Sequence, residues 1–341
     1  VERSRGLGDV YKRQLLNLKA LFFKSNLMKK ILLIIIFYLF SMYTCLFGNI
    51  SKKKRILFVI NPLSHEIKNL DIKKIIERNL DPNQFEYKIV YTEDVRHATY
   101  LAQNALIDTE IIAAVGGDGT VNEVGRALVN TKRVLAIIPV GSGNGFARHL
   151  GIPIGLIKAI KALNRSYIAV IDTGKINDNI FLGTAGIGFD AQIAHKFALF
   201  KKRGFFSYCR IAINEFSLYK PKSYFITIDG KKMIRKAFIL TFANSSQYGN
   251  NFTIAPKAEI SDGSLDLAII DDVPRYSVPQ LIYKFKHKTL DRSDHFETHR
   301  FQELIIHYPN IQAHLDGEPV FFQNEIKVTI EPKSLKVLIP K

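Results

Sequence analysis

Two glycine-rich segments of this 341-residue chain have the composition of loops that hold phosphate. The first, residues 116–120, reads Gly-Gly-Asp-Gly-Thr and directly follows the apolar run 111–115. Glycines let backbone N–H groups approach an anion, and the N-terminus of a following helix adds favourable dipole charge. The second, residues 141–145, reads Gly-Ser-Gly-Asn-Gly and follows the apolar run 134–140. Two such loops predict neighbouring parallel strands that bind a ligand at their carboxyl ends.

Neither loop has the spacing of the commonest nucleotide-binding motifs. The chain contains no Gly-x-x-x-x-Gly-Lys-Ser/Thr segment, which argues against a P-loop NTPase. Phe146 stands where the third glycine of the dinucleotide fingerprint would fall, which disfavours a Rossmann dehydrogenase. For the first loop alone, a plain strand–helix turn capped by Asp118 is an equal alternative.

The segments around the loops alternate between strand-like and helix-like patterns. This alternation predicts a doubly wound, parallel α/β domain over residues 52–165. Short β-like runs and Asp-Gly turns then predict an antiparallel β-rich domain over 166–325. Within it, residues 191–218 form a helical stretch rich in basic and aromatic side chains. That stretch suits a membrane interface or, equally, a solvated helix over ordinary core aromatics.

The first 51 residues have the character of a leader. Residues 1–14 share no pattern with the rest and are expected to be an artefact of sequence assembly. An apolar run at 31–47 follows the first methionine, Met28. It is a signal peptide, a membrane anchor, or sequence upstream of a start at Met42. As an anchor it would leave the body in the cytoplasm, because Lys and Arg follow it.

The charge is strongly basic and unevenly spread. The chain carries 48 Lys and Arg against 31 Asp and Glu, a net charge of +17. A moderately basic body suits anionic lipid and nucleotide. We find no RNA or DNA recognition motif, and we expect no nucleic-acid partner. Two cysteines, Cys45 and Cys209, make a disulfide framework improbable.

The two glycine loops resemble those of the diacylglycerol kinase catalytic domain family. The second loop extends this resemblance as Pro-x-Gly-Ser-Gly-Asn-x-Phe-Ala at 139–147, and further matches run from Asn61 to Glu318. The resemblance implies a nucleotide-binding domain related to NAD kinases and phosphofructokinases, a C-terminal β-rich domain, and ATP as the donor. Residues 326–341 would return to the first domain. The implied nucleotide contacts are Asn61, Thr92, Gly116, Gly117, Asp118, Gly119, Thr120, Val121, Asn122 and Ser142. Thr92 is equally suited to capping the next helix.

Residues 244–266 resemble the family segment that holds a structural Mg²⁺. The resemblance implies Glu259, Asp262 and Ser264 as ligands, the last through its carbonyl, and oxygen ligands suit Mg²⁺. A plain Asp-Gly turn is the alternative. The chain departs from the family at residues 249–251, Gly-Asn-Asn, where more glycines are usual.

Residues 316–318, Asp-Gly-Glu, are similar to the family's acidic motif beside the active site. A carboxylate there can accept the proton of a lipid hydroxyl. Glu318 is the first choice for this base and Asp316 the second, with a plain hairpin turn as the alternative. Residues 188–191 also match the family, and Asp190 is expected to cap the following helix.

These patterns predict an ATP-dependent lipid kinase that phosphorylates diacylglycerol, with Mg²⁺ as cofactor. The alternatives are a sphingoid-base or other lipid kinase, an NAD kinase, and a catalytically silent lipid-binding protein. The protein is expected in the cytoplasm, peripheral to the inner face of the membrane and its anionic surface. Residues 31–47 would add an anchor if native, and a homodimer is left open.

Overall fold

The structure is a computed structural model that describes residues 12–17, 19, 24, 27–39, 53–200 and 205–341. Residues 1–52 and 53–341 are separate units. In the first, residues 27–39 are helical and exposed, whereas 40–47 of the apolar run lie outside the described residues. No helix in the described ranges combines the length and apolarity needed to span a bilayer.

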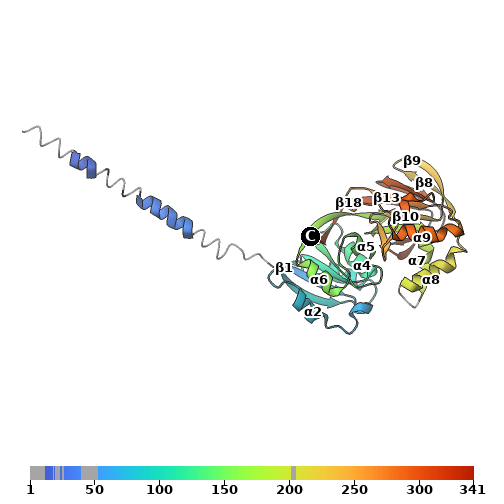
Figure 1. Cartoon of the computed structure of the whole chain (residues 1–341), viewed down its shortest axis with the longest axis horizontal. Helices are drawn as coiled ribbons and strands as arrows, with labels where there is room; N and C mark the ends of the chain where they lie inside the picture. The colour runs from blue at the N-terminus through green and yellow to red at the C-terminus, as the bar shows by residue number, and fades with distance from the viewer. Residues whose placement is uncertain (1–11, 18, 20–23, 25–26, 40–52, 201–204) are drawn as a thin grey trace, which may run out of the picture. The chain divides into compact units, whose positions relative to one another are not determined.

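The first half of residues 53–341 is built on four parallel strands in the order β2-β1-β3-β4. Every residue of β3 and β4 is buried, as expected for parallel strands covered on both faces. The chain in this part alternates strand and helix, which confirms the predicted α/β class (Figure 1). The strands are β1 (Lys54–Ile60), β2 (Phe85–Tyr91), β3 (Ile111–Gly116) and β4 (Val134–Pro139).

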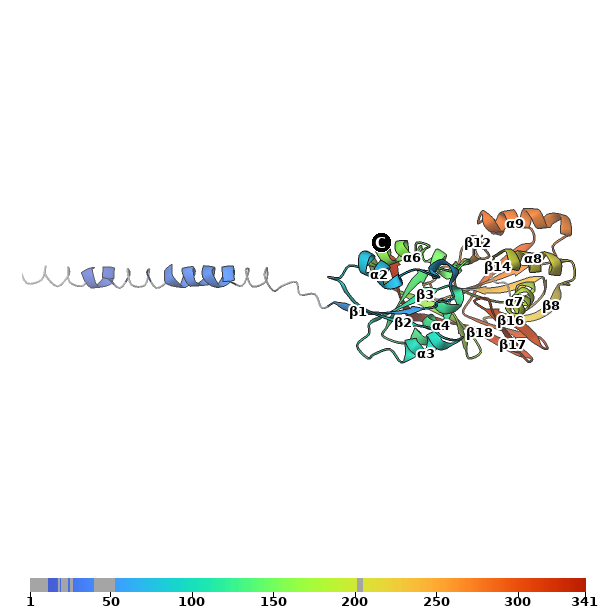
Figure 2. The same ribbon diagram turned by 90° about the horizontal axis from the view of Figure 1, so that it is seen from below.

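Helices cover both faces of this sheet, because alternate residues of each strand point to opposite sides. Ile56 and Phe58 of β1 pack with α2 and α6, whereas Leu57 and Val59 pack with α3, α4 and α5. Figure 2 shows α2 and α6 on one side of the sheet and α3 and α4 on the other. The elements are η1 (His65–Ile67), α2 (Ile72–Asn79), α3 (His97–Gln103), α4 (Asp118–Leu128), α5 (Gly145–His149) and α6 (Leu156–Leu163).

The sheet continues into the second half through one long strand, β18 (Glu325–Pro340). Its C-terminal part pairs in parallel with β4 on one side, its N-terminal part pairs antiparallel with β15, and most of its length pairs antiparallel with β5. Ten strands belong to this sheet, so the two predicted halves share one hydrogen-bonded layer. Its other members are β5 (Ser166–Ile176), β6 (Asn179–Phe181), β8 (Lys222–Ile228), β9 (Lys231–Ala237) and β15 (Glu303–His307).

A second, antiparallel sheet packs on this layer and completes the predicted β-rich half. Its order is β14-β13-β10-β7-β16-β17, and Phe242 and Leu267 of this sheet meet Leu304 and Val328 of the first in one core. The strands are β7 (Thr184–Gly188), β10 (Ile239–Ala243), β13 (Leu265–Ile270), β14 (Phe296–Phe301), β16 (Ile311–Leu315) and β17 (Glu318–Phe322).

Helices and a hairpin surround the second sheet. The predicted helical stretch 191–218 is two helices, and residues 201–204 between them lie outside the described residues. Nothing is described of the side chains of Phe205, Phe206 and Tyr208, on which part of the aromatic prediction rests. These elements are α7 (Phe189–Leu199), α8 (Phe205–Phe216), α9 (Val278–Lys286), β11 (Gln247–Gly249), β12 (Phe252–Thr253), η2 (Arg275–Ser277) and η3 (Leu290–Arg292).

Candidate functional site

The carboxyl ends of four adjacent strands gather most of the predicted nucleotide contacts. Asn61 follows β1, Thr92 follows β2, Gly116 ends β3, and Ser142 lies two residues beyond the Val140 that follows β4. Thr92 does not cap α3, because the N-cap position of that helix is Arg96. The N–H of Thr92 donates instead to the carbonyl of Ile60. The strand order therefore produces one continuous edge for a ligand, as in other open α/β sheets.

The first glycine loop leads into the N-terminus of α4. Gly117 is the N-cap and has no side chain to bond the helix, so the first-turn N–H groups of Gly119 and Thr120 have no helical partner, whereas the Asp118 N–H lies against its own carboxylate. A Cβ at Gly116 would overlap the Thr120 side chain. The hydroxyl of Thr120 accepts a hydrogen bond from Asn61 Nδ2 at 3.2 Å. The loop thus has the free donors and the close packing that anion binding requires.

Two other predicted nucleotide contacts contribute to packing. Val121 is buried in the core beneath the sheet, and its N–H donates to the carbonyl of Gly117. Asn122 is also buried and donates to the main-chain carbonyl of Asp316 at 3.4 Å. Both residues position α4 rather than present a group at the open edge. Ser142, by contrast, is exposed at the tip of the second loop.

Asp118 ties the two glycine loops together. Its carboxylate accepts the backbone N–H groups of Asn144 at 2.8 Å and Gly145 at 2.9 Å. A Cβ at Gly143 would lie 2.7 Å from Asp118 Oδ2, so the loop passes the carboxylate only because residue 143 has no side chain. Burial raises the pKa of the Asp118 carboxyl, and these two N–H donors oppose the rise. Asp118 therefore acts on the shape of the site through the second loop.

The β16–β17 turn brings the predicted acidic motif to the same place. Asp316 and Gly317 have φ values of 52° and 85°, the left-handed pair that closes a tight hairpin. Asp316 accepts the N–H groups of three consecutive residues at 2.7–3.0 Å, so both oxygens of its carboxylate are already hydrogen-bonded to the backbone. The Glu318 carboxylate, in contrast, accepts no backbone N–H group from the described residues. It lies close to Gly119, since a Cβ added there would be 3.8 Å from Glu318 Oε1. The geometry favours Glu318 over Asp316 as the group that faces the phosphate loop.

Arg126 joins this site, and the sequence motifs do not contain it. Its Nη1 lies 3.1 Å from Glu318 Oε2, and its Nη2 lies 3.6 Å from Asp316 Oδ2. Burial raises the pKa of Glu318, and the Arg126 charge lowers it. Arg126 stands one turn after Asn122, on the same face of α4. A basic residue four positions after Asn122 is the sequence pattern from which Arg126 could have been predicted.

Asp190 lies in the first turn of α7, whose N-cap position is Gly188, and its Oδ1 accepts the N–H of Ala191 in that turn at 2.8 Å. Its Oδ2 is buried and accepts hydrogen bonds from Thr241, Tyr248 and His314. His314 Nδ1 accepts the N–H of Gly317, so its Nε2 carries the proton donated to Asp190. The pair supports the turn that carries Glu318.

The segment 249–251 keeps a tight hairpin despite its asparagines. Gly249, Asn250 and Asn251 all have positive φ, and asparagine tolerates that region better than most residues. Asn250 N–H donates to the carbonyl of Gly143 at 3.2 Å, and Gly249 forms a β-bridge with Asn144. The hairpin therefore packs directly on the second glycine loop.

The predicted metal ligands lie near a third acid, Asp266, whose pKa is raised by burial and by the charges of Asp262 and Glu259. Asp262 Oδ1 accepts from Ser264, its Oδ2 lies 3.1 Å from Arg300 Nη2, and Glu259 is exposed. No group of three His, Cys, Asp or Glu side chains in the described ranges is arranged to hold a metal ion. The predicted set of two carboxylates and a main-chain carbonyl is a different arrangement, and Mg²⁺ at these residues stays a prediction.

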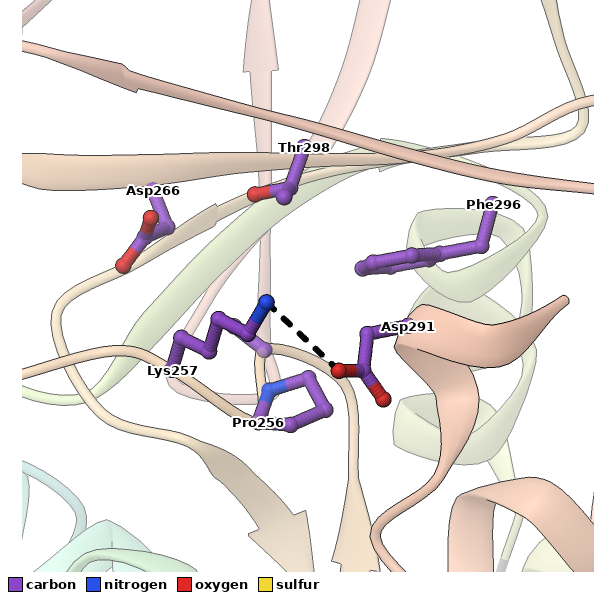
Figure 3. Close-up of a pocket in the computed structure, with 7 residues that line it drawn as sticks. Pro256, Lys257, Asp266, Asp291, Phe296 and Thr298 are labelled. Atoms are coloured by element: carbon purple, nitrogen blue, oxygen red, sulfur yellow. Dashed lines mark ion pairs between the residues drawn. The ribbon is translucent and has the colours of Figure 1, made fainter.

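A small pocket opens near this segment, between the β12–β13 connection and β14 (Figure 3). Its volume is about 10 Å³, which is room for about one water molecule. Lys257 and Asp291 form an ion pair beside it, with Nζ and Oδ2 3.6 Å apart. None of its lining residues is a predicted site residue, and it is too small for a substrate.

Family models match both halves of the chain. Residues 55–176 match the model described as the diacylglycerol kinase catalytic domain. Residues 183–339 match the one described as the YegS C-terminal NAD kinase beta sandwich-like domain.

Curated relatives of similar length also match. A protein named diacylglycerol kinase from Mycobacterium tuberculosis (strain ATCC 25618 / H37Rv) is 29% identical over 73% of this chain and 82% of its own. A probable lipid kinase YegS-like protein from Chromohalobacter salexigens is 30% identical over 67% of this chain and 76% of its own. A solved structure titled a putative diacylglycerol kinase from Bacillus anthracis str. Sterne superposes with a TM-score of 0.69 at 21% identity. It covers 85% of this chain and 96% of that one, and it supports the fold alone.

Proposed function

The chain belongs to the diacylglycerol kinase and YegS-like lipid kinase family, and on that premise we propose that it transfers the γ-phosphoryl group of ATP to a lipid hydroxyl. The acceptor proposed is diacylglycerol, which would give phosphatidic acid. One observation carries the proposal: the carboxylate of Glu318 faces Gly119 in the first turn of α4. A base and a phosphate-binding helix N-terminus are the two protein groups that this transfer needs at one point.

In the proposed reaction, the lipid hydroxyl oxygen attacks the γ-phosphorus while its proton passes to Glu318. The bond between the γ-phosphorus and the β–γ bridging oxygen breaks, and ADP leaves with that electron pair. The outward N–H groups of α4 hold phosphate oxygens. Arg126 orients the Glu318 carboxylate through its 3.1 Å ion pair. Asp118 keeps the second loop, with Ser142 at its tip, beside the donor.

Several properties of the proposed enzyme extend from its chemistry. ATP is cytoplasmic and diacylglycerol lies in the bilayer, so we place the reaction at the inner face of the membrane. The net charge of +17 favours an anionic surface as partner. A homodimer is a further proposal, which sedimentation of the full chain tests directly.

The test is transfer from radiolabelled ATP to a panel of acceptors in mixed micelles. Diacylglycerol, sphingosine, ceramide and NAD are assayed with the wild-type protein and with Glu318→Gln. We expect labelled phosphatidic acid from the wild type and a loss of about 10²- to 10⁴-fold in the variant, the usual contribution of a general base. Transfer to sphingosine or ceramide would show that diacylglycerol is the wrong acceptor. Transfer to NAD would show that the protein is not a lipid kinase. No transfer to any acceptor would indicate a catalytically silent lipid-binding protein.

A further inference from the structure

The outer face of α9 departs from an ordinary surface helix. Its inner side, Val278, Leu281 and Phe285, packs into a core cluster with α7 and α8. Its outer side carries Ile282 and Tyr283, which are 49% and 61% exposed. A surface helix normally presents charged or polar residues outward, with apolar residues only on the packed side. α9 is therefore apolar on both sides.

This outer face is continuous with an aromatic residue just before the helix. Tyr276, in η2, is 85% exposed. Pro279, Ile282, Tyr283 and Lys286 follow at helical spacing on one side of α9, and all four are exposed. Both views place α9 beside α8 at the outside of the second half (Figures 1 and 2). Among the residues that the structure describes, no other element covers these large apolar and aromatic side chains.

The charge within this helix and directly next to it has one sign. Residues 275–288 contain four Lys and Arg and no Asp or Glu. Of the acids nearest in the sequence, Asp272 pairs with Lys236 and Asp291 with Lys257, Asp271 contacts His295, and Asp294 is exposed beyond η3. In the part of the chain that the structure describes, Arg275, Lys286 and Lys288 form no ion pair. Their charge is available to an anionic partner.

We propose that the face formed by Tyr276, Ile282, Tyr283, Arg275 and Lys286 docks on an anionic lipid bilayer. Aromatic and aliphatic side chains ringed by cations are the composition of helices that lie in the headgroup region. A second copy of the chain is a poorer occupant, because two faces of like charge would repel. The proposal rests on the lipid kinase function and adds to it the surface that meets the membrane.

The position of α9 connects this face to the site. The rings of Phe285 on α9 and Phe252 on β12 lie 6.4 Å apart. The other strand of that hairpin bridges from Gly249 to Asn144 in the second glycine loop. The β11–β12 hairpin therefore lies between α9 and the second glycine loop. Docking through α9 would bring the bilayer close to the proposed donor site.

The chain contains no tryptophan, so a single Trp reports on its own surroundings. We would place Trp at Tyr283 in the full chain and, as a matched control, at Tyr167, which is 49% exposed on β5. With phosphatidylglycerol/phosphatidylcholine vesicles, Tyr283→Trp emission is expected to shift to the blue and to be quenched by brominated lipid. Tyr167→Trp is expected to stay unchanged, even if the N-terminal apolar run also brings the protein to vesicles.

Charge is tested in the Tyr283→Trp background. Arg275→Gln with Lys286→Gln is expected to weaken phosphatidylglycerol binding by about fivefold for each cation removed. Lys231→Gln with Lys232→Gln on β9 removes the same amount of charge at another surface, and is expected to change phosphatidylglycerol binding little. No blue shift in the Tyr283→Trp protein, or equal shifts in both tryptophan variants, overturns the docking proposal. Turnover in detergent micelles is read separately, so failure of docking and failure of lipid kinase activity give different results.

Discussion

Arg126 and Glu318 form an ion pair, with Nη1 and Oε2 3.1 Å apart, between a helix of the first half and a turn of the second. The same guanidinium lies 3.6 Å from Asp316 Oδ2 and donates to the carbonyl of Leu315. One side chain thus holds the proposed base and the turn that carries it. The first prediction concerns what this charge does to the base.

Replacing Arg126 by Gln is expected to move the acid limb of the pH–rate profile to higher pH. Burial already raises the pKa of Glu318, and the Arg126 cation lowers it, so loss of the cation raises that pKa further. A base with a higher pKa is protonated, and inactive, at a higher pH. The measurement is kcat/KM against pH for both proteins. An acid limb that stays in place would show that Glu318 is not the titrating base.

Glu318 and Asp316 are expected to respond differently to amide substitution. Asp316→Asn keeps one acceptor oxygen and turns the other into an NH₂ group, which then faces at least one of the three backbone N–H donors; this should cost about 1–3 kcal/mol in the free energy of unfolding. Glu318→Gln should leave stability nearly unchanged while removing turnover, because its side chain is 43% exposed and bonded only to Arg126. Urea unfolding and kinase assays on both variants check this. The reverse pattern would exchange the two roles.

Asp118→Asn is expected to raise the KM for ATP and lower kcat. An amide keeps one acceptor oxygen, whereas the carboxylate now receives both Asn144 N–H and Gly145 N–H. The second loop then loses one of its two restraints. Asp71→Asn is a matched control, since it makes the same change at the N-cap of α2, where asparagine caps equally well. Equal kinetics for wild type and Asp118→Asn would remove Asp118 from the site.

His149 is expected to make stability depend on pH. Burial, with a contribution from Lys288, lowers the pKa of His149 from 6.5 to about 4. The unfolded chain therefore binds a proton that the folded chain does not between these pH values, and stability falls as pH drops from 6.5 to 4, by at most about 3 kcal/mol. His149→Gln should lack this slope, and His307→Gln, at an exposed position, should keep it. Parallel slopes in all three proteins would contradict the buried, neutral state of His149.

The sequence by itself determined the fold class and the edge of the sheet where a ligand would bind. Alternating strand and helix patterns specify a parallel sheet, and glycine loops after two apolar strands must lie at its carboxyl ends. These are local properties, because periodicity and turn chemistry act over a few residues. The hairpin at residues 316–318 was predicted for the same reason.

Only the tertiary structure decided which side chains meet across the chain. Arg126 and Glu318 are 192 positions apart, and no local pattern relates them. Asp190 accepts a first-turn N–H of α7, as its position predicted, but only the packing brings Thr241 and His314 to its other oxygen, because β10 and β16 pair with β7. Asp118 likewise binds the backbone of the second loop. Pairings of this kind depend on how sheets and helices stack, which the order of residues along one element does not specify.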